Sequence, residues 1–284
     1  MRFSGALVEV VSTRHSSTAI VVAHPDDEAI WLSSALASAG RIVFCFGAIF
    51  EQSAQSDARR RAVAALPLAG LTDLAIPESG AGFRFGSPVP ELTSAGVGIE
   101  APEARARYES NYERLTVALR TALAGLEQIY THNPWGEYGH PEHVQVYRAV
   151  TALQLELGYT IWFSNYVGRA SWPLAMHLAR EVCWAERRIV QPDRLMARRL
   201  MQIYRRQGAW TWSRAHRWPP EETFFSQPPS TEPAPRRPLC GEWLLDVERL
   251  RRWSPPWRAV RRRLPAPRTH PGPDDDVHTP PAAG

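Results

Sequence analysis

The stretch Thr18-Ala-Ile-Val-Val-Ala-His24-Pro25-Asp26-Asp27-Glu28 decides the fold class. Its first part is apolar and rich in β-branched residues, which is typical of a strand buried on both faces of a parallel sheet. The acidic residues that follow favour a helix N-terminus. Helix-forming residues continue over 29–39, and Gly40 is expected to end this helix. A buried strand that leads directly into a helix indicates an α/β fold.

The same alternation of strands and helices continues along the chain. Further strands are predicted over 41–46, 73–76, 128–131 and 159–163, and further helices over 56–66, 103–126, 140–157 and 193–207. This order predicts a Rossmann-like α/β fold, with a mostly parallel twisted sheet and helices on both faces. Ligands of such sheets bind beyond the carboxyl ends of the strands. The segment 77–102 is long and rich in Gly, Pro and Ser, so we expect a binding loop there.

Proline marks a change in the organisation of the chain, because many of its 25 prolines follow Trp218. We expect a globular domain over 1–218, and a Pro-rich linker with an Arg/Trp-rich extension over 219–264. Residues 265–284 are expected to be a disordered tail. The extension has two interpretations, namely a helix packed on the body with a solvated Arg face or a peripheral contact with an anionic membrane. We expect no nucleic-acid partner, and the sequence leaves the oligomeric state open.

The composition excludes several classes of chemistry. All 33 basic residues are Arg, so a Schiff-base lysine and a P-loop lysine are both absent. The net charge of +4 is modest. The three cysteines are far apart and form no zinc-binding or disulfide pattern. The sequence shows no secretory signal and no apolar run near the ~20 residues needed to cross a bilayer, so a cytoplasmic location is expected.

Two clusters of polar residues carry candidate metal chemistry. The first is His24-Pro-Asp-Asp-Glu28 and the second lies within Trp135–His143. A catalytic zinc ion takes three protein ligands and keeps one position open for water. His24 and Asp27 lie three residues apart at a strand-to-helix turn and can share one face, while His143 can supply the third ligand. The remaining residues available for proton transfer or for supporting the ligands are Asp26, Glu28, His140 and Glu142.

These motifs resemble those of the PIG-L/LmbE family of zinc-dependent N-acetylglucosaminyl deacetylases. The family's His-Pro-Asp-Asp-Glu motif follows its first strand and is matched without change by His24–Glu28. Its His-x-x-His helix start is matched by His140–His143. The resemblance covers the 18–163 region by the order of its elements, and its specificity lies in the two motifs together.

The resemblance implies a role for each matching residue. It implies that His24, Asp27 and His143 bind Zn²⁺. It also implies that Asp26 is the general base and that His140, when protonated, stabilises the oxyanion. The further residues that it implies are Tyr138, which would help stabilise the transition state, Glu78, which replaces a sugar-binding Asp, and Arg59 and Arg60 as candidates for a substrate-binding Arg. Glu28 has two interpretations, because it could orient a ligand histidine or cap the helix.

The expected function is a metal-dependent hydrolase that removes an N-acetyl or other N-acyl group from a small molecule. The substrate would be an amino sugar, a glycolipid or a related natural-product intermediate. Two alternatives remain open. One is a non-haem iron enzyme, because two His and one Asp also suit Fe²⁺. The other is a non-catalytic membrane- or anion-binding protein that acts through its Arg-rich tail. An acidic run at a helix start and an isolated His-x-x-His are ordinary features singly, but here both follow predicted strands.

Overall fold

The structure, a computed structural model, describes residues 17–82, 89–179, 181–213, 215–230, 239 and 243–251. The chain divides into two units, Met1–Ser254 and Pro255–Gly284, and every described residue belongs to the first. The predicted tail and most of the Arg/Trp-rich extension therefore lie outside the described residues. None of the helices in the described ranges has the length and apolar character needed to span a bilayer.

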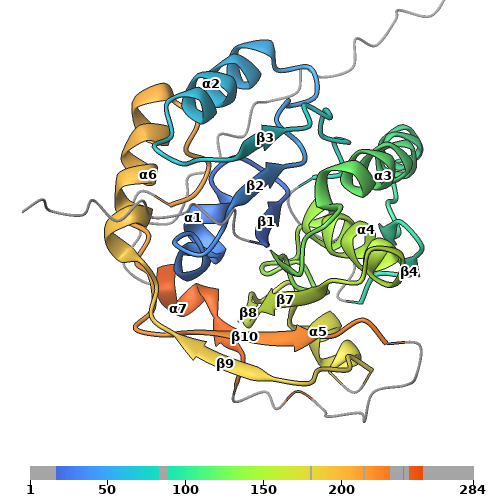
Figure 1. The fold of residues 1–284 in the computed structure, drawn as a ribbon. Helices are drawn as coiled ribbons and strands as arrows, with labels where there is room; N and C mark the ends of the chain where they lie inside the picture. Colours follow the sequence, from blue (N-terminus) through green and yellow to red (C-terminus); the bar gives the residue numbers. More distant parts are fainter. Residues whose placement is uncertain are drawn as a thin grey trace, which may run out of the picture. The chain divides into compact units, whose positions relative to one another are not determined.

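A seven-stranded sheet forms the centre of the described part, with the strand order β3-β2-β1-β6-β7-β10-β9 (Figure 1). The strands are β1 (Thr18–Val22), β2 (Arg41–Phe44), β3 (Leu71–Asp73), β6 (Gln128–Thr131), β7 (Thr160–Ser164), β9 (Arg187–Val190) and β10 (Glu222–Gln227). Five strands of this sheet, β1, β2, β3, β6 and β7, are parallel, whereas β10 is antiparallel to both of its neighbours, β7 and β9. This arrangement confirms the predicted α/β class with a mostly parallel sheet.

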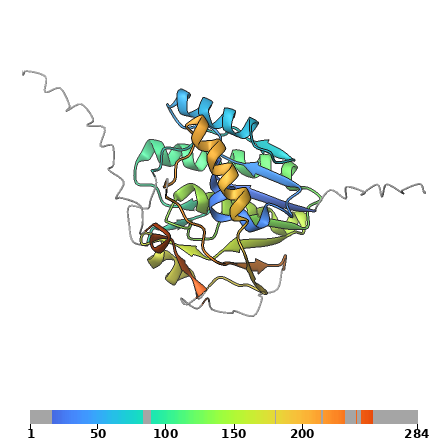
Figure 2. The same ribbon diagram turned by 90° about the vertical axis from the view of Figure 1, so that its left-hand side faces the viewer.

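Helices cover both faces of this sheet (Figures 1 and 2). The helices are α1 (Asp27–Trp31), α2 (Ser53–Ala64), α3 (Pro102–Leu123), α4 (Pro141–Leu157), α5 (Trp172–Leu178), α6 (Arg194–Gln207) and α7 (Val247–Arg251). Successive residues of β1 point to opposite faces. Ala19 and Val21 pack in a cluster with α3 and α4, whereas Ile20 and Val22 pack with α1, α2 and α6. The central strand is thus buried on both sides, as its apolar run predicts.

Shorter elements complete the described part. They are the 3₁₀ turn η1 (Ser33–Ala35), the hairpin strands β4 (Leu92–Thr93) and β5 (Gly96–Val97), and the paired strands β8 (Tyr166–Val167) and β11 (Leu245–Asp246). The hairpin β4–β5 lies inside the segment predicted as a binding loop.

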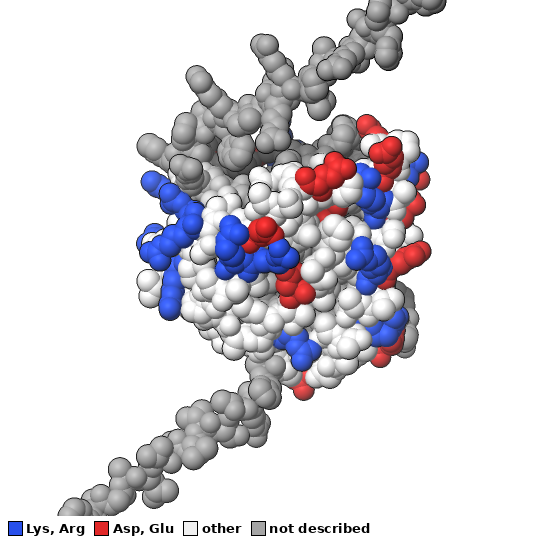
Figure 3. Space-filling view, turned by 90° about the horizontal axis from the view of Figure 1, so that it is seen from above, with Lys and Arg blue, Asp and Glu red and all other residues white. Residues whose placement is uncertain are grey.

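Positive charge gathers on one side of the described part. Figure 3 shows arginines on the side where α6 lies. The exposed arginines of α6 are Arg194, Arg198, Arg199, Arg205 and Arg206.

The first helix and the third strand have other bounds than predicted. The helix predicted over 29–39 ends at Trp31, and a 3₁₀ turn replaces its continuation. The carboxylate of Glu222 accepts hydrogen bonds from Ser33 and Ser34, and these contacts compete with a regular helix. The strand predicted over 73–76 lies instead at Leu71–Asp73 and shares only Asp73 with the prediction, because Ala75 adopts a φ of 51° that is incompatible with an extended strand.

The predicted linker is wrong over Glu222–Gln227, which form β10 inside the main sheet. The prolines on either side of this run suggested a linker, but proline is also common just outside a strand. Phe224 packs against Tyr130 on one face, and Phe225 packs against Phe163 on the other. The division of the chain into domains otherwise stays a prediction.

Candidate metal centre

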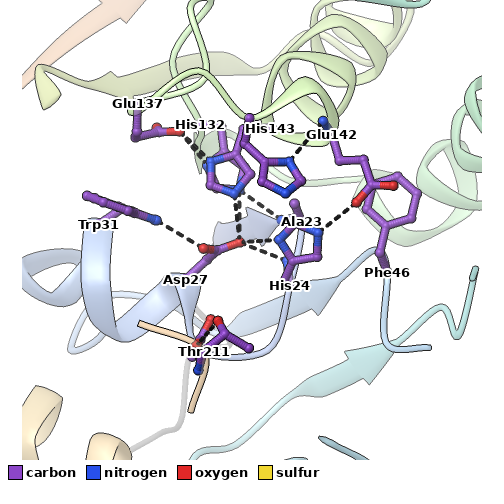
Figure 4. A network of polar contacts seen from close by, with 12 residues as sticks. Ala23, His24, Asp27, Trp31, Phe46, His132, Glu137, Glu142, His143 and Thr211 are labelled. Carbon is purple, nitrogen blue, oxygen red and sulfur yellow. Dashed lines mark hydrogen bonds and ion pairs between the residues drawn. The ribbon is translucent and has the colours of Figure 1, made fainter. Parts of the chain in front are cut away.

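The candidate metal centre lies where the order of the strands along the sheet reverses. From β1 the chain continues to β2 and β3 on one side, whereas β6 and β7 lie on the other side. The carboxyl ends of the strands beside such a reversal, here β1 and β6, are the usual binding position in sheets of this kind. His24 follows β1 and His132 follows β6 directly, so both candidate motifs meet at this edge (Figure 4).

The carboxylate of Asp27 is the centre of the cluster. Its Oδ2 lies 3.2 Å from His24 Nδ1, 3.4 Å from His143 Nε2 and 3.5 Å from His132 Nε2. The same oxygen accepts the main-chain N–H of His24 at 2.8 Å, and Oδ1 accepts the indole N–H of Trp31 at 2.9 Å. These two hydrogen bonds hold the carboxylate in a fixed orientation toward the three imidazoles. Burial alone would raise the pKa of Asp27, but the neighbouring imidazoles, His143 first among them, hold it well below its usual range.

Glu137 orients two of these imidazoles from the opposite side. Its Oε2 lies 2.7 Å from His143 Nδ1 and 3.0 Å from His132 Nδ1. Because His132 Nε2 accepts the main-chain N–H of Ala23 at 2.8 Å, the proton of His132 is on Nδ1 and is donated to Glu137. Burial opposes ionisation of Glu137, yet His132 and the two imidazole hydrogen bonds lower its pKa to about 2. The ionised carboxylate therefore keeps a proton on His143 Nδ1 and leaves the lone pair on Nε2.

Glu142 orients the imidazole of His24 in the same way. Its Oε2 lies 2.8 Å from His24 Nε2, and its Oε1 accepts the N–H and the hydroxyl of Ser79 at 2.6 and 2.8 Å. An acceptor at Nε2 places the proton of a neutral His24 there and leaves the lone pair of Nδ1 facing Asp27. Glu142 thus holds the His24 ring from the Nε2 side, opposite the nitrogen that faces Asp27.

The residues fit a divalent metal ion. His24, Asp27 and His143 each offer one ligand atom, and these atoms all lie within 4.8 Å of one another. His143 Nε2 is buried and has no hydrogen-bond partner among the described residues, which is costly unless a cation occupies the space before it. Two imidazoles and one carboxylate are ligands that zinc prefers, and they also suit Fe²⁺. Two further groups of possible ligands share members with this one. They are His24, His140 and Glu142, and His132, Glu137 and His143.

Asp26 sits next to the cluster in an unusual conformation. Its φ is 115°, which is rare for a residue with a side chain and stores backbone strain. Its Oδ2 accepts two hydrogen bonds from Thr211, one from the N–H at 2.9 Å and one from the hydroxyl at 2.7 Å. Burial raises the pKa of Asp26 to about 7, and the adjacent charge of Asp27 adds to the shift. Such a carboxylate is suited to accept a proton near neutral pH.

Glu28 supports this turn through the backbone. Its Oε2 accepts the N–H of Asp26 at 3.1 Å, and its Oε1 accepts the hydroxyl of Tyr204 at 2.9 Å. Burial raises the pKa of Glu28 to about 8. These contacts match the capping interpretation, because within the described ranges the side chain bonds to no ligand histidine.

Two side chains from the second motif cover the cluster. The ring of His140 lies 4.8 Å, centroid to centroid, from the rings of both His24 and His143. Its Nδ1 accepts the N–H of Glu142 at 3.2 Å, so Nε2 carries the proton and is a donor. Burial lowers the pKa of His140, which favours this neutral ring over the protonated one that the resemblance implies. The ring of Tyr138 lies 5.3 Å from that of His143 and 5.7 Å from that of His140.

A cavity of about 260 Å³ adjoins the cluster. Its lining residues are Ile49, Phe50, Gln52, Glu78, Gly80, Ala81, Gly82, His140 and Glu142. Glu78 lines this cavity, and its Oε1 is 2.6 Å from Arg59 Nη1 and 3.7 Å from His24 Nε2. Arg59 also donates to the carbonyl of Phe46 at 3.2 Å, so this buried arginine holds Glu78 in place. A second cavity of about 610 Å³ shares Gly80 and Ala81 with the first.

The structure does not bring Arg60 into the site. Its side chain is 68% exposed and pairs with Asp57 one turn earlier on α2. Arg59 and Arg60 are neighbours on a helix and therefore point about 100° apart, so only one of them can face the sheet. The position in the sequence did not reveal which one does.

Sequence reasoning missed two residues that the geometry shows to be important. Glu137 lies inside the second motif, but nothing in the spacing indicated that one carboxylate would bridge two histidines. Thr211 lies 185 residues from Asp26 in a segment without a recognisable motif, so no local signal could have identified it.

Comparisons with known proteins find likeness in structure alone. No protein-family model matches the sequence, and no curated protein is significantly similar to it. A solved deacetylase of the teicoplanin biosynthesis pathway superimposes with a TM-score of 0.46 at 15% identity, covering 73% of this chain and 97% of that one. The A40926 pseudoaglycone deacetylase gives 0.44 at 11% identity, covering 77% and 100%. The N,N'-diacetylchitobiose deacetylase from Pyrococcus horikoshii gives 0.38 at 14% identity, covering 68% and 73%. At these values the likeness assigns neither family nor activity, and the functional argument rests on the side chains.

Proposed function

We propose that this protein is a metal-dependent hydrolase that cleaves an N-acyl amide in a small molecule. One observation carries the proposal: His24, Asp27 and His143 offer ligand atoms within 4.8 Å of one another. Asp26 directly precedes Asp27 in the chain. His140, whose ring lies 4.8 Å from the rings of His24 and His143, lines a cavity. A zinc ion held by His24, Asp27 and His143 would act as a Lewis acid and would make water more acidic. The substrate class is an N-acylated amino sugar, glycolipid or related natural-product intermediate.

The residues around the ligands have complementary roles in this proposal. Asp26 accepts a proton from the water molecule that attacks the amide carbonyl. Nε2 of His140 donates a hydrogen bond to the oxygen on which negative charge develops, and removing one such donor typically costs about 2.7–4 kcal/mol of transition-state stabilisation. The C–N bond then breaks, the nitrogen gains a proton, and a carboxylic acid and an amine are released.

The cavity supports a polar substrate of moderate size. Glu78 presents a carboxylate at its wall and is suited to accept hydrogen bonds from hydroxyl groups. Phe50 adds an aromatic surface, which Arg107 covers at 4.0 Å from the ring centroid. The adjoining larger cavity offers room for the remainder of a substrate that is larger than one sugar.

The proposal is tested with purified protein loaded with Zn²⁺ and a panel of N-acylated amino sugars, with amine release as the readout. Asp26→Asn should retain zinc but lose about 10²- to 10⁴-fold in turnover, because it removes the proton acceptor. His24→Ala should lose zinc binding itself. His177→Ala is the matched control, since His177 is an exposed histidine of α5 and should bind metal and turn over normally. Full activity of Asp26→Asn would remove Asp26 as the base, and turnover that requires iron and oxygen would refute the hydrolase.

A further inference from the structure

The segment 209–213 reaches the candidate site from the C-terminal part of the described chain. Gly208 adopts a φ of 74° and ends α6, after which the N–H of Ala209 bonds to the carbonyl of Tyr204 at 2.8 Å. The chain then passes Asp26, where Thr211 donates both its N–H and its hydroxyl to Oδ2. Figure 4 shows Thr211 beside the cluster, on the side of Asp27 away from His143. The segment therefore touches the proposed base directly.

Aromatic contacts fix this segment against the site. The ring of Trp212 packs edge-on against Trp31 at 5.1 Å, and the indole of Trp31 in turn donates to Asp27. The same ring lies 4.9 Å from that of Tyr138. The indole N–H of Trp210 donates to the carbonyl of Ser213 at 3.1 Å and closes the turn. Thr211 is thus held between two anchored tryptophans.

Asp26 has little else to orient its side chain. It is the N-cap residue of α1 and has a positive φ, but its carboxylate makes no capping hydrogen bond to that helix. Both hydrogen bonds that its side chain accepts within the described ranges come from Thr211, and both go to Oδ2. They leave Oδ1 as the oxygen available to receive a proton. The direction in which Oδ1 points therefore depends on Thr211.

We propose that Thr211 is a positioning residue that aims the carboxylate of Asp26 at the reacting water. This inference rests on the proposed function, because it assigns Asp26 the role of base. It makes segment 209–213 part of the active site, although this segment lies far from both motifs in the sequence. A carboxylate displaced by about 1 Å can cost on the order of 100-fold in rate, so the loss of one of its two anchors should be measurable.

The kinetic test compares three variants of the zinc-loaded protein. Thr211→Val keeps the shape and the N–H but removes the hydroxyl, so kcat should fall between about 10- and 100-fold while KM changes less than about twofold. Thr211→Ser keeps the hydroxyl and should restore kcat to within about threefold of the wild type. Thr116→Val is the matched control, because the hydroxyl of Thr116 bonds to the carbonyl of Tyr112 on α3, outside the site. Full kcat in Thr211→Val would overturn the proposal.

A second measurement needs no activity and no metal. The N–H of Thr211 donates to Asp26, so Asp26→Ala should speed hydrogen exchange in residues 209–213 of the metal-free protein by at least about tenfold. Exchange in α3 serves as the internal reference for any general loss of stability. Unchanged exchange in 209–213 would show that Asp26 and Thr211 do not hold one another. If the wild type hydrolyses no N-acyl amide, the proposed function falls, but the exchange experiment still decides whether this contact exists.

Discussion

Substitution of Glu137 by Gln should weaken metal binding although the proposed ligands, His24, Asp27 and His143, do not include Glu137. All the hydrogen bonds that its carboxylate makes in the described part of the chain are accepted. Oε2 accepts from His143 and His132, and Oε1 accepts from the N–H of Asn133 at 3.0 Å and the hydroxyl of Ser164 at 3.3 Å. An amide replaces one of these acceptors with an NH₂ donor. In one orientation of the amide its NH₂ group faces the N–H groups of the two imidazoles, and in the other it faces the N–H of Asn133. In both cases two donors face each other in a fully buried site.

The magnitude follows from the two orientations of the amide. If its nitrogen faces the imidazoles, the proton of His143 must move to Nε2, where it blocks the lone pair needed for the metal. If its nitrogen faces Asn133, a buried main-chain N–H loses its partner, which costs about 1–3 kcal/mol of stability. Loss of a partner that orients a ligand typically lowers metal affinity by about 10- to 100-fold, or about 1.4–2.7 kcal/mol. We expect the zinc Kd of Glu137→Gln to rise by this factor.

The assay is competition for Zn²⁺ with a chromophoric chelator at neutral pH. Glu156→Gln is the matched control, because Glu156 lies on the same helix as His143 but is half-exposed and pairs with Arg120. Its zinc Kd should equal that of the wild type. A zinc Kd for Glu137→Gln within about twofold of the wild type, in a protein that remains folded, would refute the idea that Glu137 sets the tautomer of His143.

Two further predictions concern stability and substrate contact. Burial raises the pKa of Glu222 from its ordinary 4.5 to about 7, so its contribution to stability is fully present below pH 4.5 and is lost as the pH rises through 7. The free energy of unfolding of the wild type, measured relative to Glu222→Gln, should therefore fall by about 3 kcal/mol over this range. A pH-independent difference between the two proteins would contradict this. Arg59→Ala should raise KM by at least about tenfold, because Glu78 loses the arginine that holds its carboxylate in place. Arg60→Ala should leave KM unchanged, since Arg60 pairs with Asp57 at the surface. Equal effects of the two substitutions would be evidence against a role for Arg59 in the site.

The strand and helix pattern was readable where one local signal dominated. β1 and α4 were predicted closely, because an apolar β-branched run and a helix-forming run that ends at Gly158 each point to one structure. β10 was not, because the flanking prolines suggested a linker and its pairing partners lie far away in the chain. The early end of α1 depends on Glu222, which is 188 residues from Ser34. Such contacts leave no trace in a local window.

The sequence by itself determined the chemical inventory of this protein: an α/β chain without lysine that carries two histidine- and acid-rich motifs after buried strands. Only the tertiary structure decided which of these groups face one another, in which tautomer His24 and His143 are held, and that Arg59 rather than Arg60 approaches Glu78. The physical reason is the distance along the chain over which each effect acts. Backbone propensity and side-chain alternation act over a few residues, whereas the direction of a lone pair or a carboxylate is set by partners such as Thr211 that packing brings from distant parts of the chain.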